Sequence, residues 1–128
     1  PDTPHPVADY MADQRDIQCL GGTMRLGTFE CVLDPDSKVG KAYGTDVIHE
    51  RHRHRHELNN EYVEILEGHG MKFTGVNPDR DLIEVCEIPD HPWFVGAQFH
   101  PEFKSRPGRP NPLFRDFIAS SVKYAETI

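Results

Sequence analysis

The sequence is poor in cysteine, and its cysteines are not spaced as metal ligands or disulfide partners. It has three, at positions 19, 31 and 86, an odd number with no Cys-x-x-Cys pair among them. Disulfide frameworks and cysteine-bound zinc depend on such paired spacings. This pattern argues against both, and it favours a reducing compartment such as the cytoplasm.

Long apolar runs and an excess of positive charge are also lacking. No stretch approaches the roughly 20 apolar residues of a membrane-spanning helix, and the first residues have neither the basic nor the apolar region of a signal peptide. The formal net charge is −7 with neutral histidines. We therefore predict that neither a nucleic acid nor a membrane surface is the main partner.

Length and turn signals predict one folded unit of the α/β class. The chain has 128 residues, the size of one ordinary domain. Residues 1–20 are rich in proline and acidic residues and are predicted to form a connector or surface loop before a folded part over 21–128. Alternation, turns and helix caps predict a strand or a hairpin over 23–33, a short helix capped by Asn59 or Asn60, strands over 71–76, 82–88 and 93–99, and a C-terminal helix.

The C-terminal helix has a clear start and one packing stripe. Asn111 is a favourable cap, and Pro112 suits the first helical position. The residues of the stripe recur at helical spacing and are expected to pack together on the domain: Leu113, Phe114, Phe117, Ile118, Ser121, Val122 and Ala125. The segment 93–99 is nearly continuously apolar, so we expect a strand that is covered on both faces.

A histidine and a carboxylate stand two residues apart directly after that segment. His100 and Glu102 flank Pro101, and in an extended chain residues i and i+2 project to the same side. Proline restricts both itself and the preceding residue, which makes the pair stiff. A carboxylate on one ring nitrogen orients a histidine and leaves the other nitrogen free to accept a proton from a nucleophile. The motif predicts a base and its orienter; the alternative is a strand-capping histidine beside a solvated glutamate.

The stretch HERHRHRHE, residues 49–57, has the most unusual composition of the chain. In an extended chain its histidines and arginines fall on opposite faces: His52, His54 and His56 on one, Arg51, Arg53 and Arg55 on the other. A metal site is one hypothesis, because histidines at i and i+2 can share a zinc ion, although the interleaved arginines oppose a dication. A solvated polar strand and a clamp for an anion or carboxylate are the others, and composition does not separate these two.

Three stretches resemble one known family: GGTMRLG (21–27), ERHRHRHELNN (50–60) and HPWFVGAQFHPEFKSRP (91–107). Together they are similar to the C-terminal part of the class I glutamine amidotransferase, or glutaminase, domain of the CTP synthases. The resemblance runs in order from about residue 6 to about residue 120. It implies a three-layer α/β fold with a mixed sheet and flanking helices, of which residues 21–128 form the C-terminal half.

The resemblance also assigns roles to particular residues. Class I amidotransferases use a Cys-His-Glu triad, which implies that His100 is the general base and Glu102 its orienter. Arg55 matches a position that contacts the substrate glutamine, which favours the clamp hypothesis for the histidine-arginine run. His56 stands where the family usually has Tyr or Phe, so the resemblance assigns no contact to residue 56.

The family's nucleophile lies in a Gly-x-Cys-Leu-Gly turn after an apolar strand, and the sequence has no such turn. Cys19 precedes Leu-Gly-Gly but follows a polar segment, whereas an activated thiol needs a fixed, sheltered position beside its base. We therefore expect Cys19 to be incidental, and Cys31 and Cys86 to pack as small apolar residues in strands. The segment is predicted to carry two triad members and one substrate contact, and to be inactive alone.

For the complete enzyme, the resemblance implies that glutamine is hydrolysed and that the ammonia serves the ATP-dependent amination of UTP to CTP. ATP and magnesium would act in a separate synthetase domain, with no cofactor or metal in this segment. The implied partners are the N-terminal half of the glutaminase domain, the synthetase domain and further copies of the enzyme. Two other classes stay open: another class I amidotransferase-like hydrolase, such as a γ-glutamyl peptidase, and a non-catalytic histidine-rich metal-binding module.

Overall fold

A computed structural model describes residues 3–10 and 24–128. Their helices and strands are β1 (Ala8–Tyr10), β2 (Arg25–Leu33), α1 (Lys38–Tyr43), β3 (Val47–His54), β4 (His56–Leu58), a 3₁₀ helix η2 (Asn60–Tyr62), α2 (Val63–Glu67), β5 (Lys72–Asn77), β6 (Leu82–Glu87), β7 (Val95–Ala97), a second 3₁₀ helix η3 (Pro101–Phe103) and α3 (Pro112–Ala125). This succession confirms the predicted α/β class. None of the helices described is long and apolar enough to cross a bilayer.

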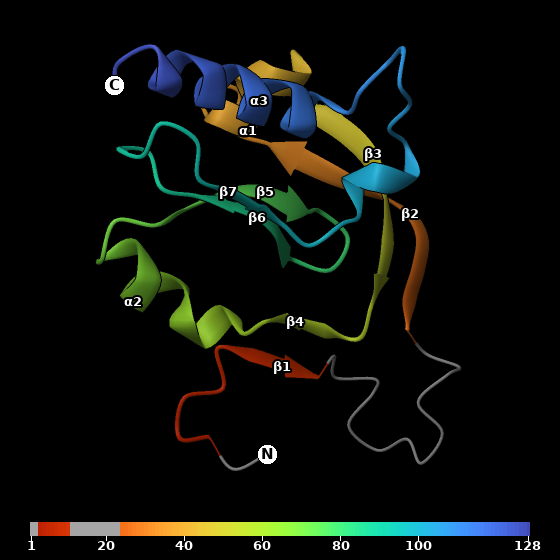
Figure 1. Ribbon diagram of the computed structural model, residues 1–128. Coiled ribbons are helices and arrows are strands. Elements are labelled where there is room, and N and C mark those ends of the chain that lie inside the picture. Colours follow the sequence, from red (N-terminus) through yellow and green to blue (C-terminus); the bar gives the residue numbers. More distant parts are fainter. Residues whose placement is uncertain (1–2, 11–23) are drawn as a thin grey trace.

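The strands form a five-stranded sheet with the order β3-β2-β5-β6-β7 and a separate pair, β1 with β4. Every strand pair in these two sheets is antiparallel. Figure 1 shows α1 and α3 together on one side of the large sheet, with β4, β1 and α2 on the opposite side. The sheet is therefore the middle layer between two helix-bearing sides.

Part of the predicted connector is a strand. Residues 8–10 form β1 and pair with β4, with Ala8 opposite Leu58 and Tyr10 opposite His56. The chain before β1 is also attached, because the carbonyl of Val7 accepts a hydrogen bond from the backbone N–H of Asn59 at 2.8 Å. This stretch is therefore structured, and the loop prediction does not hold for it.

Residues 34–37 lead into a short helix, α1, that the sequence did not predict. Ser37 caps it, because its hydroxyl accepts a hydrogen bond from the Gly40 N–H at 2.9 Å. Gly44 ends the helix in the left-handed conformation, with φ of 69°. A Cβ at Gly40 would lie 2.2 Å from the carbonyl oxygen of Asp34, so only glycine lets the helix pack this closely on the turn.

Asparagine caps mark two further helix starts, and both were predicted. Asn59 accepts from the N–H of Glu61 at 3.1 Å before η2 and α2. Asn111 accepts from the N–H of Leu113 at 3.0 Å, with Pro112 in the first position of α3. The strands predicted over 71–76 and 82–88 are present as β5 and β6, which pair across the turn at residues 78–81. Where a strand or a hairpin was predicted over 23–33, the described residues form the single strand β2.

The predicted strand over 93–99 is wrong in length and in burial. Only Val95–Ala97 form β7, an edge strand that pairs with β6 alone, and all three residues are partly exposed. The continuous apolar pattern predicted a strand with both faces covered. Among the described residues, however, one edge of β7 and part of both its faces are exposed. The side chain that reaches the core is Phe99, which is buried beyond the end of the strand.

The core lies between the large sheet and the helices α1 and α3. Its buried apolar residues form one cluster: Cys31, Leu33, Val39, Ile48, Val85, Phe99 and Leu113. A polar network closes this layer, because Glu50 of β3 accepts hydrogen bonds from the Tyr43 hydroxyl at 2.8 Å and from the Asn111 amide at 3.1 Å. These bonds fix α1 and α3 on β3.

Candidate active site

His100 and Glu102 are in direct contact. The Nδ1 atom of His100 lies 2.7 Å from Oε1 of Glu102. The contact was predicted for an extended chain, but the residues after His100 form the 3₁₀ helix η3, with Pro101 at its start. A single tight turn therefore brings the carboxylate back to the ring. The predicted contact is present, but the extended backbone predicted for it is wrong.

The geometry of this pair determines its protonation. An ionised carboxylate can only accept hydrogen bonds, so Nδ1–H of His100 donates to Glu102 and Nε2 remains available. The hydrogen bond from His100 holds the pKa of Glu102 below its usual value. The His100 ring also stacks on Phe103, with ring centroids 5.2 Å apart and planes inclined by 21°. With 38 % of its side chain exposed, His100 is oriented and still accessible.

Residues 98–104, which we call the His100 arm, are fixed against the neighbouring strand β3. The backbone N–H of His100 donates to the carbonyl of Arg51 at 2.8 Å. Lys104 donates from Nζ to the carbonyl of His49 at 2.5 Å. Because β3 is anchored in the large sheet, these bonds place His100 relative to the histidine-arginine run.

Arg55 lies in that run, at the bend between β3 and β4. Its Nη2 atom donates to the sulfur of Met24 at 3.3 Å. Arg55 lies four positions after Arg51, a distance of about 13 Å along an extended chain. The structure thus brings His100 and Glu102 together and places Arg55 just beyond the end of β3, the strand that anchors His100.

Burial in β3 alternates as predicted for an extended chain, with His52 buried and both Arg51 and Arg53 exposed. The alternation stops at Arg55, so the prediction that His56 shares the face of His52 and His54 is wrong. His56 begins β4 and is exposed, with its ring 4.4 Å from that of Tyr10. The bend at Arg55 reverses the register of the faces.

A buried polar cluster, which the sequence reading did not detect, lies behind this strand. Arg25 of β2 and Glu84 of β6 form an ion pair and are only 2 % and 1 % exposed. Nδ1 of His52 lies 3.6 Å from the Glu84 carboxylate and 2.8 Å from Nε2 of His54. The Arg25 guanidinium also stacks over Phe29, 4.5 Å from the ring centroid. No local pattern marks these partners, because they come from three different strands.

The environment of the cluster shifts the pKa of its members in a consistent way. Burial, followed by the charge of Arg25, lowers the pKa of His52 to about 3. Burial likewise lowers the pKa of His54 to about 4. Burial raises the pKa of Glu84 to about 7, although Arg25 opposes the shift. Both histidines are therefore neutral at physiological pH, and each offers one nitrogen lone pair.

Three side chains of this cluster are arranged as possible metal ligands. His52, His54 and Glu84 offer ligand atoms that all lie within 4.8 Å of one another, a spacing that a zinc ion could bridge. However, the Arg25 guanidinium already neutralises the Glu84 carboxylate, and it would repel a dication at close range in a buried site. The geometry favours a structural ion pair with two neutral histidines, so we do not assign the run to metal binding.

The two described cysteines are unsuited to act as nucleophiles. Cys31 is fully buried in the core, where burial raises its pKa to about 12. Burial also raises the pKa of Cys86, which is half-buried in β6. A reactive thiol needs a lowered pKa and an accessible position. These cysteines pack in strands as predicted, and Cys19 lies outside the described residues.

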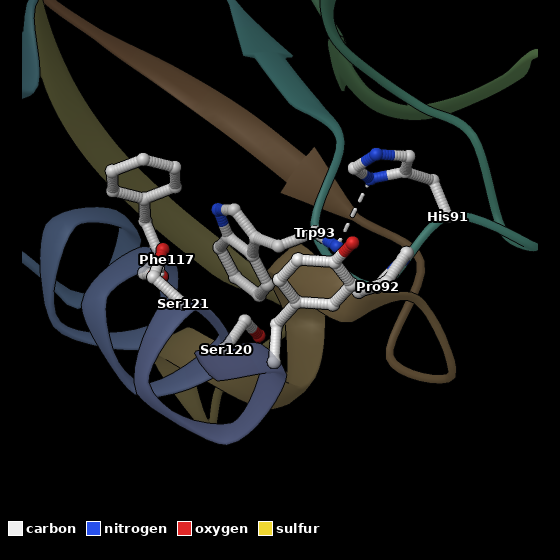
Figure 2. A pocket seen from close by; sticks show the side chains of 7 residues that line it. His91, Pro92, Trp93, Phe117, Ser120 and Ser121 are labelled. Atoms are coloured by element: carbon white, nitrogen blue, oxygen red, sulfur yellow. Dashed lines mark hydrogen bonds between the residues drawn. The ribbon is translucent and has the colours of Figure 1, made fainter. Parts of the chain in front are cut away.

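The helix α3 leaves its apolar face open. Of the stripe predicted to pack, only Leu113 is buried, and the other six members are exposed: Phe114, Phe117, Ile118, Ser121, Val122 and Ala125. Two cavities of about 370 and 420 Å³ lie along this face and share Trp93 and Phe117. Figure 2 shows the segment 91–93 facing α3 across the first of them. The predicted packing of the stripe is therefore not achieved among the residues that the structure describes.

Comparison with known proteins gives the family. The chain belongs to the class-I glutamine amidotransferase family, whose model matches residues 7–120. Within that family it is similar to CTP synthases: it is 61 % identical over 123 residues to the enzyme of Symbiobacterium thermophilum and 54 % identical over 126 residues to that of Bacillus velezensis. These matches cover 96 % and 98 % of this chain but only 23 % and 24 % of the two relatives. The chain thus spans about a quarter of their length.

A solved structure agrees with the sequence comparison. The fold is similar to that of a Trypanosoma brucei CTPS glutaminase domain with bound acivicin, with a TM-score of 0.84 and 33 % sequence identity. The match covers 94 % of this chain and 47 % of that chain. The predicted resemblance to the CTP synthase glutaminase domain is therefore confirmed, and this chain corresponds to about half of such a domain.

Proposed function

We propose that this chain supplies the general base and its orienting carboxylate to the glutaminase site of a CTP synthase. The observation that carries the proposal is the 2.7 Å contact between Nδ1 of His100 and Glu102 on an accessible turn. The match to class I amidotransferases over residues 7–120 supports the reaction class, and identities of 54–61 % support CTP synthase over another amidotransferase-like hydrolase.

In the proposed reaction, a cysteine thiol transfers its proton to Nε2 of His100, and the resulting thiolate attacks the carboxamide carbon of glutamine. The imidazolium is stabilised by Glu102 and then donates this proton to the departing ammonia, which leaves a glutamyl thioester. Water attacks the thioester with His100 again accepting a proton, and glutamate and the free thiol are released. Glutamine and water thus give glutamate and ammonia.

Other groups of the site come from two places. The thiol is contributed by the remainder of the glutaminase domain, because Cys31 is buried, Cys86 is half-buried, and burial raises the pKa of both thiols. Backbone N–H groups of the same part stabilise the oxyanion. Arg55 binds glutamine through its guanidinium, which suits the carboxylate of the amino acid. The arginine side chain and an extended glutamine together can bridge the distance between Arg55 and His100.

In the complete enzyme, the ammonia is used by a synthetase domain that aminates UTP to CTP with ATP and magnesium. The rest of the glutaminase domain covers the open apolar face of α3, which explains why a helix with a clear apolar stripe leaves Phe117 half exposed. This segment alone is inactive, because it holds two of the three triad members.

Replacing His100 with alanine in the complete enzyme tests the assignment. We expect glutamine-dependent CTP synthesis to fall by about 10²–10⁴-fold, the usual contribution of a general base. Synthesis from added ammonium chloride should continue at the wild-type rate, because ammonia bypasses the glutaminase site. Loss of both activities, or retention of both, would contradict the proposed role.

A further inference from the structure

The His100 arm makes a third contact with the histidine-arginine run, through Gln98. Its amide nitrogen Nε2 donates to the carbonyl oxygen of His56, 42 residues away in the sequence. The backbone of Gln98 is itself fixed, because its N–H donates to the carbonyl of Glu84 at 2.8 Å. Gln98 therefore connects β6, through its backbone, with the residue that follows Arg55, through its side-chain amide.

The bend at Arg55 joins two different strand pairs. The β2–β3 ladder ends at the pair of Arg25 with His54, and the β1–β4 ladder begins at His56, so Arg55 lies between two ladders. The His56 carbonyl also accepts from Nδ1–H of His54 at 2.9 Å. With that proton on Nδ1, the lone pair on Nε2 of His54 accepts from Nδ1–H of His52 at 2.8 Å. Two side-chain donors thus converge on the carbonyl that sets the direction of the chain after Arg55.

The contacts of the arm bracket Arg55. The His100 N–H holds the carbonyl of Arg51 before the bend, and the Gln98 amide holds the carbonyl of His56 after it. Between these two donors lies Phe99, whose side chain is buried in the core cluster and anchors the arm there. The distance between the Arg55 bend and the His100 ring is therefore set by a short, rigid piece of chain.

We propose that Gln98 is a positioning residue, which holds the Arg55 bend at the distance from His100 that glutamine requires. The inference rests on the proposed function, because it takes Arg55 as the substrate-binding group and His100 as the base. Gln98 touches neither the substrate nor the reacting atoms; it acts on binding through the backbone at His56. Its loss should weaken glutamine binding and leave the chemistry at His100 nearly intact.

The test is Gln98→Met in the complete enzyme, which keeps the length of the side chain and removes the donor. We expect KM for glutamine to rise about tenfold, the scale of one lost hydrogen bond, while kcat at saturating glutamine stays within about threefold of wild type. Gln98→Glu, whose carboxylate also lacks an N–H, should give the same increase and serves as the second variant if Gln98→Met does not fold. A merely structural role would lower kcat or the yield of enzyme without this selective change in KM.

Lys104→Met is the matched control. Lys104 belongs to the same arm and also donates to a backbone carbonyl of β3, that of His49, but this carbonyl lies on the side away from Arg55. Because this bond helps to place His100, the expected effect of Lys104→Met is on kcat, and KM for glutamine should stay unchanged. An equal increase in KM for Lys104→Met would mean that any loosening of the arm has this effect, and the specific role of Gln98 would be overturned.

Arg55→Met, measured in parallel, tests the substrate-binding role of Arg55 separately from the positioning role of Gln98. If Arg55→Met raises KM and Gln98→Met does not, the positioning role is wrong and the assignment of Arg55 stands. If neither variant changes KM, the assignment of Arg55 fails, and the inference fails with it. If Gln98→Met lowers kcat at an unchanged KM, Gln98 supports His100 rather than Arg55, which also overturns the inference.

Discussion

Replacing Arg25 with methionine would remove the only guanidinium that is paired with Glu84 in the buried cluster described above. Methionine keeps much of the apolar contact with Phe29, so the change mainly deletes the charge. The carboxyl of Glu84 would remain 1 % exposed without its counter-charge. A buried, unpaired carboxylate is strongly unfavourable, and the group responds by keeping its proton.

The expected size of the effect depends on pH. In the wild type the pKa of Glu84 is raised from the ordinary value of 4.5 to about 7. A raised folded-state pKa stabilises the fold fully below the unfolded value, and this contribution is lost as the pH rises through the folded value. Without Arg25 the pKa rises further. Below about pH 7, Glu84 is protonated in both folded proteins, so the difference between their free energies of unfolding does not change with pH. Above pH 7, the free energy of unfolding of the variant falls by ~1.4 kcal/mol per pH unit relative to wild type, which amounts to ~2 kcal/mol by pH 8.5.

The assay is urea unfolding of the complete glutaminase domain, followed by circular dichroism at pH 6, 7, 8 and 8.5. The matched control is the double variant Arg25→Met, Glu84→Gln, which has no carboxyl to titrate. We expect its difference from wild type to show no such steep increase above pH 7. A penalty for Arg25→Met that is the same at pH 6 and pH 8.5 would refute the reasoning, because Glu84 would then not depend on Arg25 for its charge.

Two further predictions concern packing. Gly75→Ala should cost about 1–3 kcal/mol of unfolding free energy, because its Cβ would lie 2.7 Å from Cγ2 of Val85 and 2.9 Å from Sγ of Cys31. Gly108→Ala, where a Cβ meets nothing within 4 Å, is the control in the same urea experiment, and an equal loss for both would contradict the steric argument. Phe117→Ala should cost about 3–5 kcal/mol in the complete glutaminase domain, if the rest of that domain covers α3. A loss below about 1 kcal/mol would mean that this face stays open.

Features that depend on neighbouring residues were predictable from the sequence. His100 and Glu102 meet because one residue, a proline, separates them, and two different backbone conformations allow the contact. The caps at Asn59 and Asn111 each satisfy an N–H two residues ahead. In each case the partner lies close in sequence, so the pattern contains the whole interaction.

Features that depend on covering layers were predicted less well. The apolar run at 93–99 indicated a strand covered on both faces, and the stripe of α3 indicated a packed helix face. Both patterns indicate that a residue is suited to burial, but they do not identify the residues that would pack against it. In this chain β7 is an edge strand and Phe117 is 51 % exposed, because the surface that would cover them is not among the described residues.

The sequence by itself therefore determined the α/β class, the two capped helix starts and the His100–Glu102 pair, since these follow from spacing along the chain. Only the tertiary structure decided which member of the histidine-arginine run is a neutral core residue and which stands at a bend. His52 is buried because Arg25 and Glu84 arrive from β2 and β6 to form its surroundings. Polar residues enter a core only with partners, and partners so distant in sequence leave no local pattern.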